Sequence, residues 1–376
     1  MGVMIAAWIG FILLNPFFSK KSYRIYLVLI AIVYSYIAYH VIFTDNMDIG
    51  RVTTSMQYWY RNGWTWFLTN KTEMDPLSAL YYYAIGLTGD THLIPAISIL
   101  ITYGFSFALI YKCSRFYNLS KRQTNMLLFF FMSIFVFFYA LSNIRIYMCF
   151  AIIAFFVYME LIEDKCHIIA WPFYIASIFF HYACFPFVLI RVLVYRYKKL
   201  TGTRILGLLV LFVLYTQAGT ILSLIGVNSG LLYTIQYKLN GYSTYSTFGI
   251  EYFIDSLLKV IPIFLTIVIF SYSSNLFNDR ENKFIHYCLL CGMFFVCTIN
   301  NYQFVLRSPN MFILLFVVVL AIAYKKKYEL TAERNYGARS FISNHNIIIF
   351  MMICASLFNI MFDSKYLIIR NMFYNF

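Results

Sequence analysis

Long apolar runs recur along the whole chain, and they restrict its fold more than any other feature. A helix that crosses a bilayer needs about 20 mainly apolar residues, and roughly a dozen segments of the sequence approach this length. Only 12% of the residues are charged, about half the share found in an ordinary soluble domain. The sequence therefore excludes a soluble enzyme and predicts one integral membrane domain over residues 1–376, an all-α polytopic transmembrane helical bundle.

We expect about twelve spans in this bundle. They are residues 4–18, 22–43, 92–111, 124–142, 143–160, 166–182, 183–198, 205–222, 251–272, 284–301, 308–324 and 345–361. The first run is expected to be a retained helix and not a signal peptide, because basic residues follow it instead of preceding it. Residues 76–90 are predicted to form a further helix that dips into the membrane interface.

The positive charges are distributed as they are in membrane proteins. The net charge is +14, but the basic residues do not form one polar face, so we do not expect nucleic acid as a partner. Most of them lie in alternate short loops, and the richer side is cytoplasmic by the positive-inside rule. These loops are residues 19–24, 112–123, 161–167, 191–204, 273–283 and 325–344. The predicted location is the bacterial cytoplasmic membrane, crossed many times, with both termini outside.

Two long segments then lie on the outer side. Residues 44–91 are polar and aromatic, whereas residues 223–250 are poor in charge and rich in Gly, Asn, Ser, Thr and Tyr. The loops on the cytoplasmic side are short by comparison, except for residues 325–344. Because binding and catalysis concentrate in elaborated loops, we expect the protein to act at the outer face.

Three ionisable residues depart from the cytoplasmic bias and fall at one predicted depth on the outer side. They are Arg145, His181 and Arg307, each at the outer end of a predicted span. Such groups are costly beside lipid and tend to be paired or functional. Arginine binds phosphate through a planar fork of donors, so Arg145 and Arg307, with Arg51 as a third candidate, suit a diphosphate. The alternative is that each Arg reaches lipid headgroups, and that His181 is an interfacial histidine instead of a general base or hydrogen-bond donor.

Carboxylates on the outer side are candidates for a general base. Asp48 and Asp75 are the most suggestive, although Asp75 precedes Pro76 and also fits the start of a helix. A solvated loop acid is the other reading of both. No DxD, GxGxxG, P-loop or GxSxG motif occurs, and Cys288 and Cys291 lack partners for a zinc site. We therefore expect no metal and no cofactor, and neither ATP-driven transport nor hydrolase chemistry.

Five segments together resemble the EpsG/Wzy-type polysaccharide polymerases, which assemble O-antigen, capsule or exopolysaccharide. They are TDNMDIGR (44–51), DPLSALYYYAIGLTGDTHLIPAISILITY (75–103), SNIRIYMCFAIIAFFVYMEL (142–161), FFHYACFPFVLIRVLVYRYKK (179–199) and VLRSPNMFILLF (305–316). The resemblance covers most of the chain, and the order and spacing of the five segments carry it. Tyr147 departs from the Gln or Asn expected near the Arg of the third segment.

The resemblance implies a GT-C-like polymerase architecture and a metal-independent glycosyl transfer. It implies that two undecaprenyl-diphosphate-linked glycans are joined in the outer leaflet of the membrane. Arg145, His181 and Arg307 are then the first candidate residues, with Asp48, Arg51 and Asp75 behind them. Membrane lipid, a chain-length regulator and a flippase are the implied partners.

Two other functions compete with this reading. A flippase for lipid-linked glycans needs a similar number of spans, but it is expected to place charges along a central cavity. Lys259 is the main charge that the sequence places in the middle of a span. A membrane acyltransferase that modifies the polymer is the third possibility, and it is expected to carry a His/Arg pair from the first span onward.

Overall fold

The protein is seen here in a computed structural model, whose described residues are helical. No strand occurs among them. The described residues are 22–41, 50, 52, 61–65, 75–135, 137–196, 202–217, 221, 223–225, 257, 260–261, 263–268, 270–271, 276–298 and 302–332. The predicted spans 4–18 and 345–361, Lys259 and most of the predicted outer loops lie outside this part of the chain.

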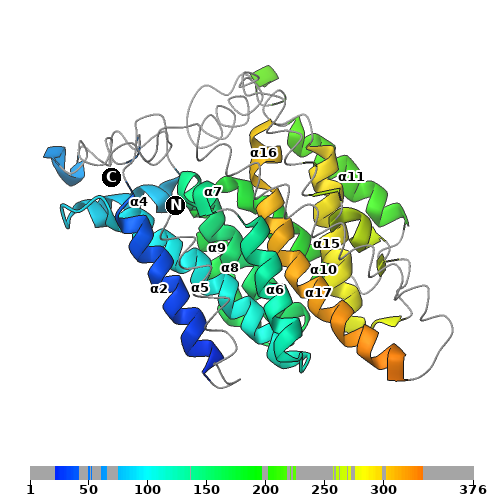
Figure 1. The fold of residues 1–376 in the computed structure, drawn as a ribbon. Helices are drawn as coiled ribbons and strands as arrows, with labels where there is room; N and C mark the ends of the chain where they lie inside the picture. The colour runs from blue at the N-terminus through cyan, green and yellow to red at the C-terminus, as the bar shows by residue number, and fades with distance from the viewer. Residues whose placement is uncertain are drawn as a thin grey trace.

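The helices lie side by side as a bundle (Figure 1). In chain order they are α2 (Tyr23–Tyr39), α4 (Pro76–Gly86), α5 (Leu93–Phe116), α6 (Lys121–Ile134), α7 (Phe137–Ser142), α8 (Ile144–Leu161), α9 (His167–Phe180), the 3-10 turn η3 (Tyr182–Cys184), α10 (Phe185–Arg196), α11 (Gly202–Thr216), α15 (Asp279–Cys297), α16 (Tyr302–Arg307) and α17 (Pro309–Ala332). Short connections such as the one between α8 and α9 make consecutive long helices antiparallel.

Three of the described helices are long and apolar enough to cross a membrane. They are Leu93–Phe116 (α5), Ile144–Leu161 (α8) and Pro309–Lys326 of α17. Their length follows from the apolar runs, since 20 helical residues span about 30 Å. The protein is therefore a membrane protein by the length and composition of its helices, and the total of about twelve spans remains a prediction.

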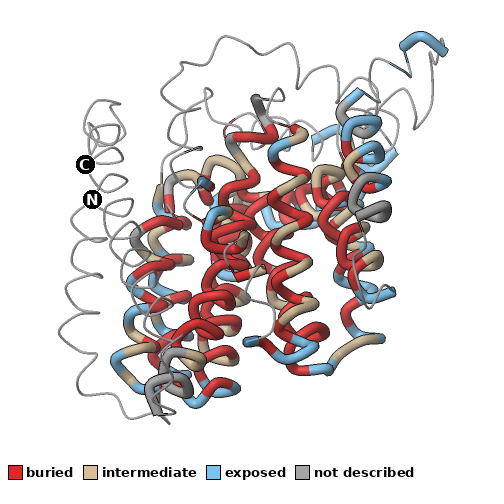
Figure 2. The backbone as a smooth tube through the Cα atoms, turned by 90° about the vertical axis from the view of Figure 1, so that its right-hand side faces the viewer, coloured by how far each residue is buried: buried red, intermediate tan, exposed pale blue. Residues whose placement is uncertain are grey.

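Helix α8 forms the centre of the bundle. Fifteen of its residues are buried, and it packs against α5, α9 and α17. Figure 2 shows this central region as continuous buried backbone. A helix that is apolar on every side is buried among other helices, and α8 and α17 have this character.

Two helices at the surface present apolar side chains outward. The exposed apolar residues are Ile25, Val28, Leu29, Ile32, Val33 and Tyr36 on α2, and Ile168, Ile169, Trp171, Phe173, Ile175 and Phe179 on α9. Contiguous exposed apolar surface of this kind marks contact with a membrane or a partner. On α2 and α9 it suits contact with acyl chains.

The predicted span 124–142 differs from the structure, which breaks it into α6 and α7. Helix α6 ends at Ile134, and Phe135 leaves the helical conformation with ψ at 90°. The ring of Phe135 is fully buried between Tyr103 and Tyr147, 5.8 and 5.2 Å away between ring centroids. No Pro or Gly marks this break, so packing and not local sequence locates it.

The bundle has two chemically distinct ends. At one end α4, α8, α10 and α17 begin, and Figure 1 shows α4, α7 and α16 there. We name it the Arg145 end. At the other end the chain turns between α8 and α9, and α10 and α17 finish; we name it the Arg191 end. The described residues of the predicted cytoplasmic loops fall at the Arg191 end, and Asp75, Arg145, His181 and Arg307 fall at the Arg145 end.

Candidate functional site

Asp75 stands at the start of α4, in the N-cap position with Pro76 as the first helical residue. The spacing is the usual one for a helix start, but the carboxylate forms no cap to the helix. It is 3% exposed, and its Oδ2 lies 3.5 Å from Nη1 of Arg145. Asp75 is therefore neither a solvated loop acid nor a capping side chain, and its charge faces an arginine 70 residues away.

Arg145 occupies the first turn of α8. A cation there is opposed by the positive end of the helix dipole, and Asn143 offers no side-chain cap. The nearby Asp75 offsets part of this cost. The Arg145 side chain is 17% exposed, whereas the side chain of the carboxylate that it faces is 4% exposed.

Apolar packing holds α4 against the start of α8. Ile144, directly before Arg145, is buried together with Val52 and the α4 residues Ala79, Tyr82 and Ile85. This cluster brings the N-terminal ends of two helices together. Backbone N–H groups at helix starts attract anions, so the Arg145 end combines two helix dipoles with a guanidinium.

His181 ends α9 in an extended conformation and is 3% exposed. Its Nδ1 accepts a hydrogen bond from the backbone N–H of Ala183 at 3.2 Å. In the neutral ring the proton is then on Nε2, which makes Nε2 a donor. This geometry favours the hydrogen-bond-donor role over the general-base role among the two that the sequence left open.

The turn that contains His181 lies beside the Asp75–Arg145 pair. Burial, and then the charge of Asp75, raise the pKa of the Tyr182 phenol above its ordinary value. On the other side of the turn, the ring of Phe180 at the end of α9 packs 5.4 Å from Tyr81 of α4. Asp75, Arg145 and the turn η3 thus surround one region, although they are far apart in the sequence.

Arg307 lies at the same end of the bundle, as the last residue of α16. It is partly exposed, and its carbonyl accepts a hydrogen bond from Asn310 at 3.1 Å. Three residues earlier, Phe304 stacks on Phe187 of α10 at 6.0 Å, and Phe187 packs on Phe150 of α8 at 5.1 Å.

These three rings join the helices that carry the candidate residues. Phe150 follows Arg145 by five residues, Phe187 follows His181 by six, and Phe304 precedes Arg307 by three. With a rise of about 1.5 Å per helical residue, Arg145 stands roughly 7.5 Å along α8 from Phe150. The ring layer ties α8, α10 and α16 together.

Two predicted site residues, Asp48 and Arg51, lie outside the described residues. Val52, the neighbour of Arg51 in the sequence, is buried against α4 and the start of α8.

Sequence reasoning missed a buried polar network around Arg191, because it counted this residue both in the span 183–198 and among the basic residues of the cytoplasmic loop 191–204. The structure places Arg191 in the helix and not in the loop: α10 continues to Arg196, and Arg191 is buried inside it. The guanidinium forms a two-point pair with Glu160 of α8 through Nε, at 2.7 Å, and Nη2. Tyr174 of α9 donates a further bond to Glu160 at 2.5 Å. The sequence feature that could have indicated this network is Glu160, a carboxylate at the end of the apolar run 143–160.

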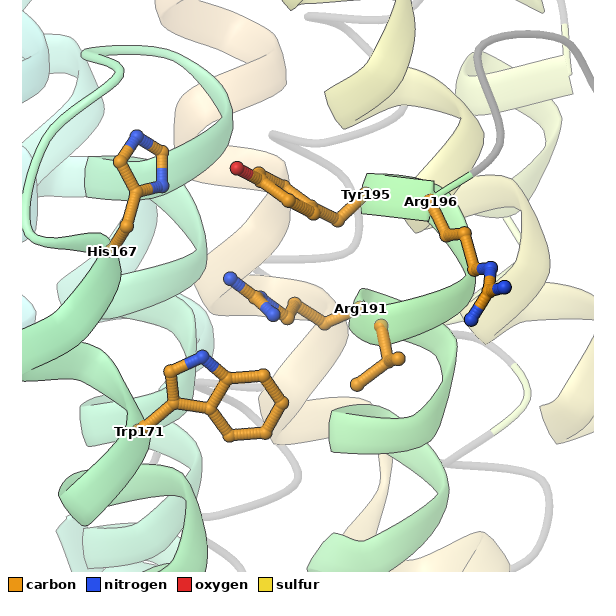
Figure 3. A pocket seen from close by; sticks show the side chains of 6 residues that line it. His167, Trp171, Arg191, Tyr195 and Arg196 are labelled. Carbon is orange, nitrogen blue, oxygen red and sulfur yellow. The ribbon is translucent and has the colours of Figure 1, made fainter.

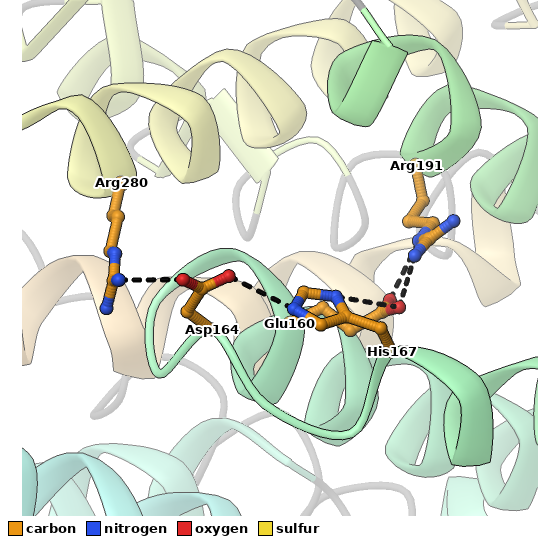
Figure 4. A network of polar contacts seen from close by, with 5 residues as sticks. All are labelled: Glu160, Asp164, His167, Arg191 and Arg280. Atoms are coloured by element: carbon orange, nitrogen blue, oxygen red, sulfur yellow. Dashed lines mark hydrogen bonds and ion pairs between the residues drawn. The ribbon is translucent and has the colours of Figure 1, made fainter.

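The network continues to the surface through His167 (Figure 4). The His167 ring lies 3.8 Å from Glu160 and 3.0 Å from Asp164. Asp164 in turn accepts a bond from Arg280 at 2.7 Å. Four segments of the chain, carrying α8, α9, α10 and α15, are tied together at the Arg191 end.

No family model, curated protein or solved structure matches this chain. Its function is therefore to be inferred from the chemistry and placement of its own residues.

Proposed function

We propose that this protein is a polysaccharide polymerase. It joins undecaprenyl-diphosphate-linked oligosaccharide repeats by glycosyl transfer at the outer face of the bacterial cytoplasmic membrane. The observation that best supports the proposal is the meeting of Asp75, Arg145 and the His181 turn at one end of a membrane bundle. The sequence had separated these residues by up to 106 positions.

In the proposed reaction, a hydroxyl of one lipid-linked repeat attacks the anomeric carbon of the growing chain's reducing-end sugar. The bond between that carbon and the phosphate oxygen breaks, and its electron pair leaves with undecaprenyl diphosphate. Negative charge therefore develops on the leaving diphosphate. Preorganised cations and N–H donors stabilise such charge most effectively in a site that excludes water.

Arg145 takes the central role in this scheme. Asp75 pairs with its guanidinium, and the starts of α4 and α8 add positive dipole ends. In the proposed reaction, Nε2–H of His181 donates a further hydrogen bond to the leaving diphosphate. Arg307 supplies a second cation from α16, and Arg51 a third. Asp75 is already paired with Arg145, so we assign its carboxylate to positioning the guanidinium. Asp48 is therefore our choice for the base that takes the proton of the attacking hydroxyl.

The deciding experiment complements a deletion strain with wild-type protein or with Arg145→Ala. We expect normal membrane levels of the variant, loss of the long-chain glycan ladder, and accumulation of single-repeat lipid intermediates on the outer leaflet. Arg122→Ala is the matched control, since Arg122 is exposed on α6 at the other end. An unchanged ladder in Arg145→Ala would remove Arg145 from the chemistry.

The second candidate is a lipid-linked glycan flippase. The buried Glu160–Arg191 pair is the observation that favours it, because transporters place paired charges inside the bundle. The pair is saturated by Tyr174 and by each partner, which suits a structural role better. The leaflet on which the lipid intermediate accumulates distinguishes the two functions. A flippase mutant accumulates it on the inner leaflet, and a polymerase mutant on the outer leaflet.

A further inference from the structure

We propose that the Arg191 end carries a binding site for the headgroup of an anionic glycerophospholipid, independent of the polymerase site. The site is a hollow of about 530 Å³ between α9 and α10. Its lining is cationic and aromatic: His167, Trp171, Arg191, Val192, Tyr195 and Arg196. Figure 3 shows His167, Trp171, Arg191 and Tyr195 gathered between the two helices, with Arg196 on the other side of α10.

Arg191 is the fixed wall of the hollow. Its side chain is 3% exposed, and its guanidinium carbon lies 4.9 Å from the ring centres of both Trp171 and Tyr195. Figure 3 shows the guanidinium between these rings. Nε and Nη2 are committed to Glu160, so Nη1 is the nitrogen that this pair leaves for another acceptor. The site is preorganised, because Glu160 and the rings hold Arg191 before any ligand arrives.

Arg196 supplies the uncompensated charge. Glu160 balances the charge of Arg191, and the His167 ring contacts the carboxylate of Asp164. Arg196, five residues further along α10, is exposed and forms no ion pair with any residue that the structure describes. The lining therefore carries a net positive charge at its mouth. Anionic phosphates match this arrangement, since arginine is a strong phosphate donor.

The surface beside the hollow selects a lipid over a soluble anion. Ile168 and Ile169 are 86% and 60% exposed at the start of α9, and Ile175 and Phe179 continue the same exposed apolar surface along the helix. A charged pocket at the end of an apolar stripe fits an amphiphile, with its phosphate at Arg191, its acyl chains along α9, and the charge of Arg196 attracting it from the rim. Basic pockets of this kind between helices recognise anionic lipid headgroups.

The test uses the full-length protein in non-ionic detergent. Native mass spectrometry measures binding of phosphatidylglycerol, of phosphatidylcholine, and of phosphatidylglycerol in competition with inorganic phosphate. We expect phosphatidylglycerol to bind more tightly than phosphatidylcholine, and millimolar inorganic phosphate to leave it bound. Arg196→Gln should weaken phosphatidylglycerol binding about fivefold, the effect of one basic residue at a membrane surface.

The matched control is Arg122→Gln, which removes an exposed arginine from α6 at the same end and should leave binding unchanged. A second readout locates the lipid. Phosphatidylglycerol with brominated acyl chains should quench wild-type fluorescence more than that of Trp171→Phe. Equal binding of both lipids, full displacement by inorganic phosphate, or wild-type binding by Arg196→Gln would each overturn the proposal. The polymerase test depends on Arg145 and is unaffected by any of these outcomes.

Discussion

Each end of the bundle pairs an arginine with a carboxylate, and the two pairs differ in burial and in geometry. At the Arg191 end, Arg191 and Glu160 have side chains only 3% and 0% exposed and meet through two hydrogen bonds. At the Arg145 end, Arg145 is 17% exposed and meets Asp75 through one contact of 3.5 Å. The Arg191 guanidinium binds its carboxylate through two nitrogens, whereas the contact of Arg145 with its carboxylate is longer.

This difference bears on which of the two ion pairs stabilises the fold. A buried pair costs much desolvation and stabilises the fold only when its geometry is good and every group is bonded. Glu160 meets this condition, with Arg191 and Tyr174 both donating to it. The looser pair at Asp75 contributes less to the fold, and it suits the phosphate-binding role that we propose for Arg145.

The largest effect is expected at the Arg191 end. Arg191→Met leaves Glu160 buried without its cation and should lower the free energy of unfolding by about 3–5 kcal/mol. The yield of folded protein in detergent and its thermal unfolding measure this. The double variant Glu160→Leu/Arg191→Met should recover much of the loss, because no buried charge then remains. A double variant that is less stable than the single one would contradict a structural role.

The next effect is on catalysis. Arg145→Lys keeps the charge but loses the planar fork, and Arg145→Ala loses both. We expect the rate of polymer formation to fall about 10²–10³-fold in Arg145→Ala, the range for removing one donor to a developing anion. Arg145→Lys should fall between this variant and the wild type, with normal folded yield in both. Equal rates for Lys and Ala would mean that charge at this position does not assist the reaction.

Asp75→Asn should have a smaller effect on the same assay. The amide keeps the shape of the side chain and still accepts a hydrogen bond from Arg145, but it removes the charge that holds the guanidinium. We expect polymer formation to fall roughly tenfold, within the usual range for a supporting residue. If Asp75 were instead the base, Asp75→Asn would abolish activity as fully as Arg145→Ala, and this outcome would reassign its role.

The smallest effect is expected at the surface. Arg280→Gln removes an ion pair whose two side chains are 50% and 53% exposed. Exposed pairs contribute about 0–1 kcal/mol, so thermal unfolding should shift little. A loss as large as that of Arg191→Met would show that Asp164 and His167 transmit strain into the buried network.

Some of the fold could be predicted from composition and periodicity alone. The runs at 92–111, 143–160 and 308–324 match α5, α8 and α17, because a long uninterrupted apolar run has no other stable form in a membrane. The start of α4 after Asp75 followed from Pro76. The break after Ile134 did not, because it depends on where Phe135 finds room among the rings of distant helices.

The sequence by itself determined that this chain forms apolar helices, that its basic residues gather at one end, and that Arg145, His181 and Arg307 stand at the other. These properties follow from the local cost of placing each residue in lipid or in water. Only the tertiary structure decided that Arg145 faces Asp75, and that Arg191 is buried against Glu160 instead of lying in a loop. Such pairings join residues 31 and 70 positions apart, and helix packing, which local sequence does not encode, brings them together.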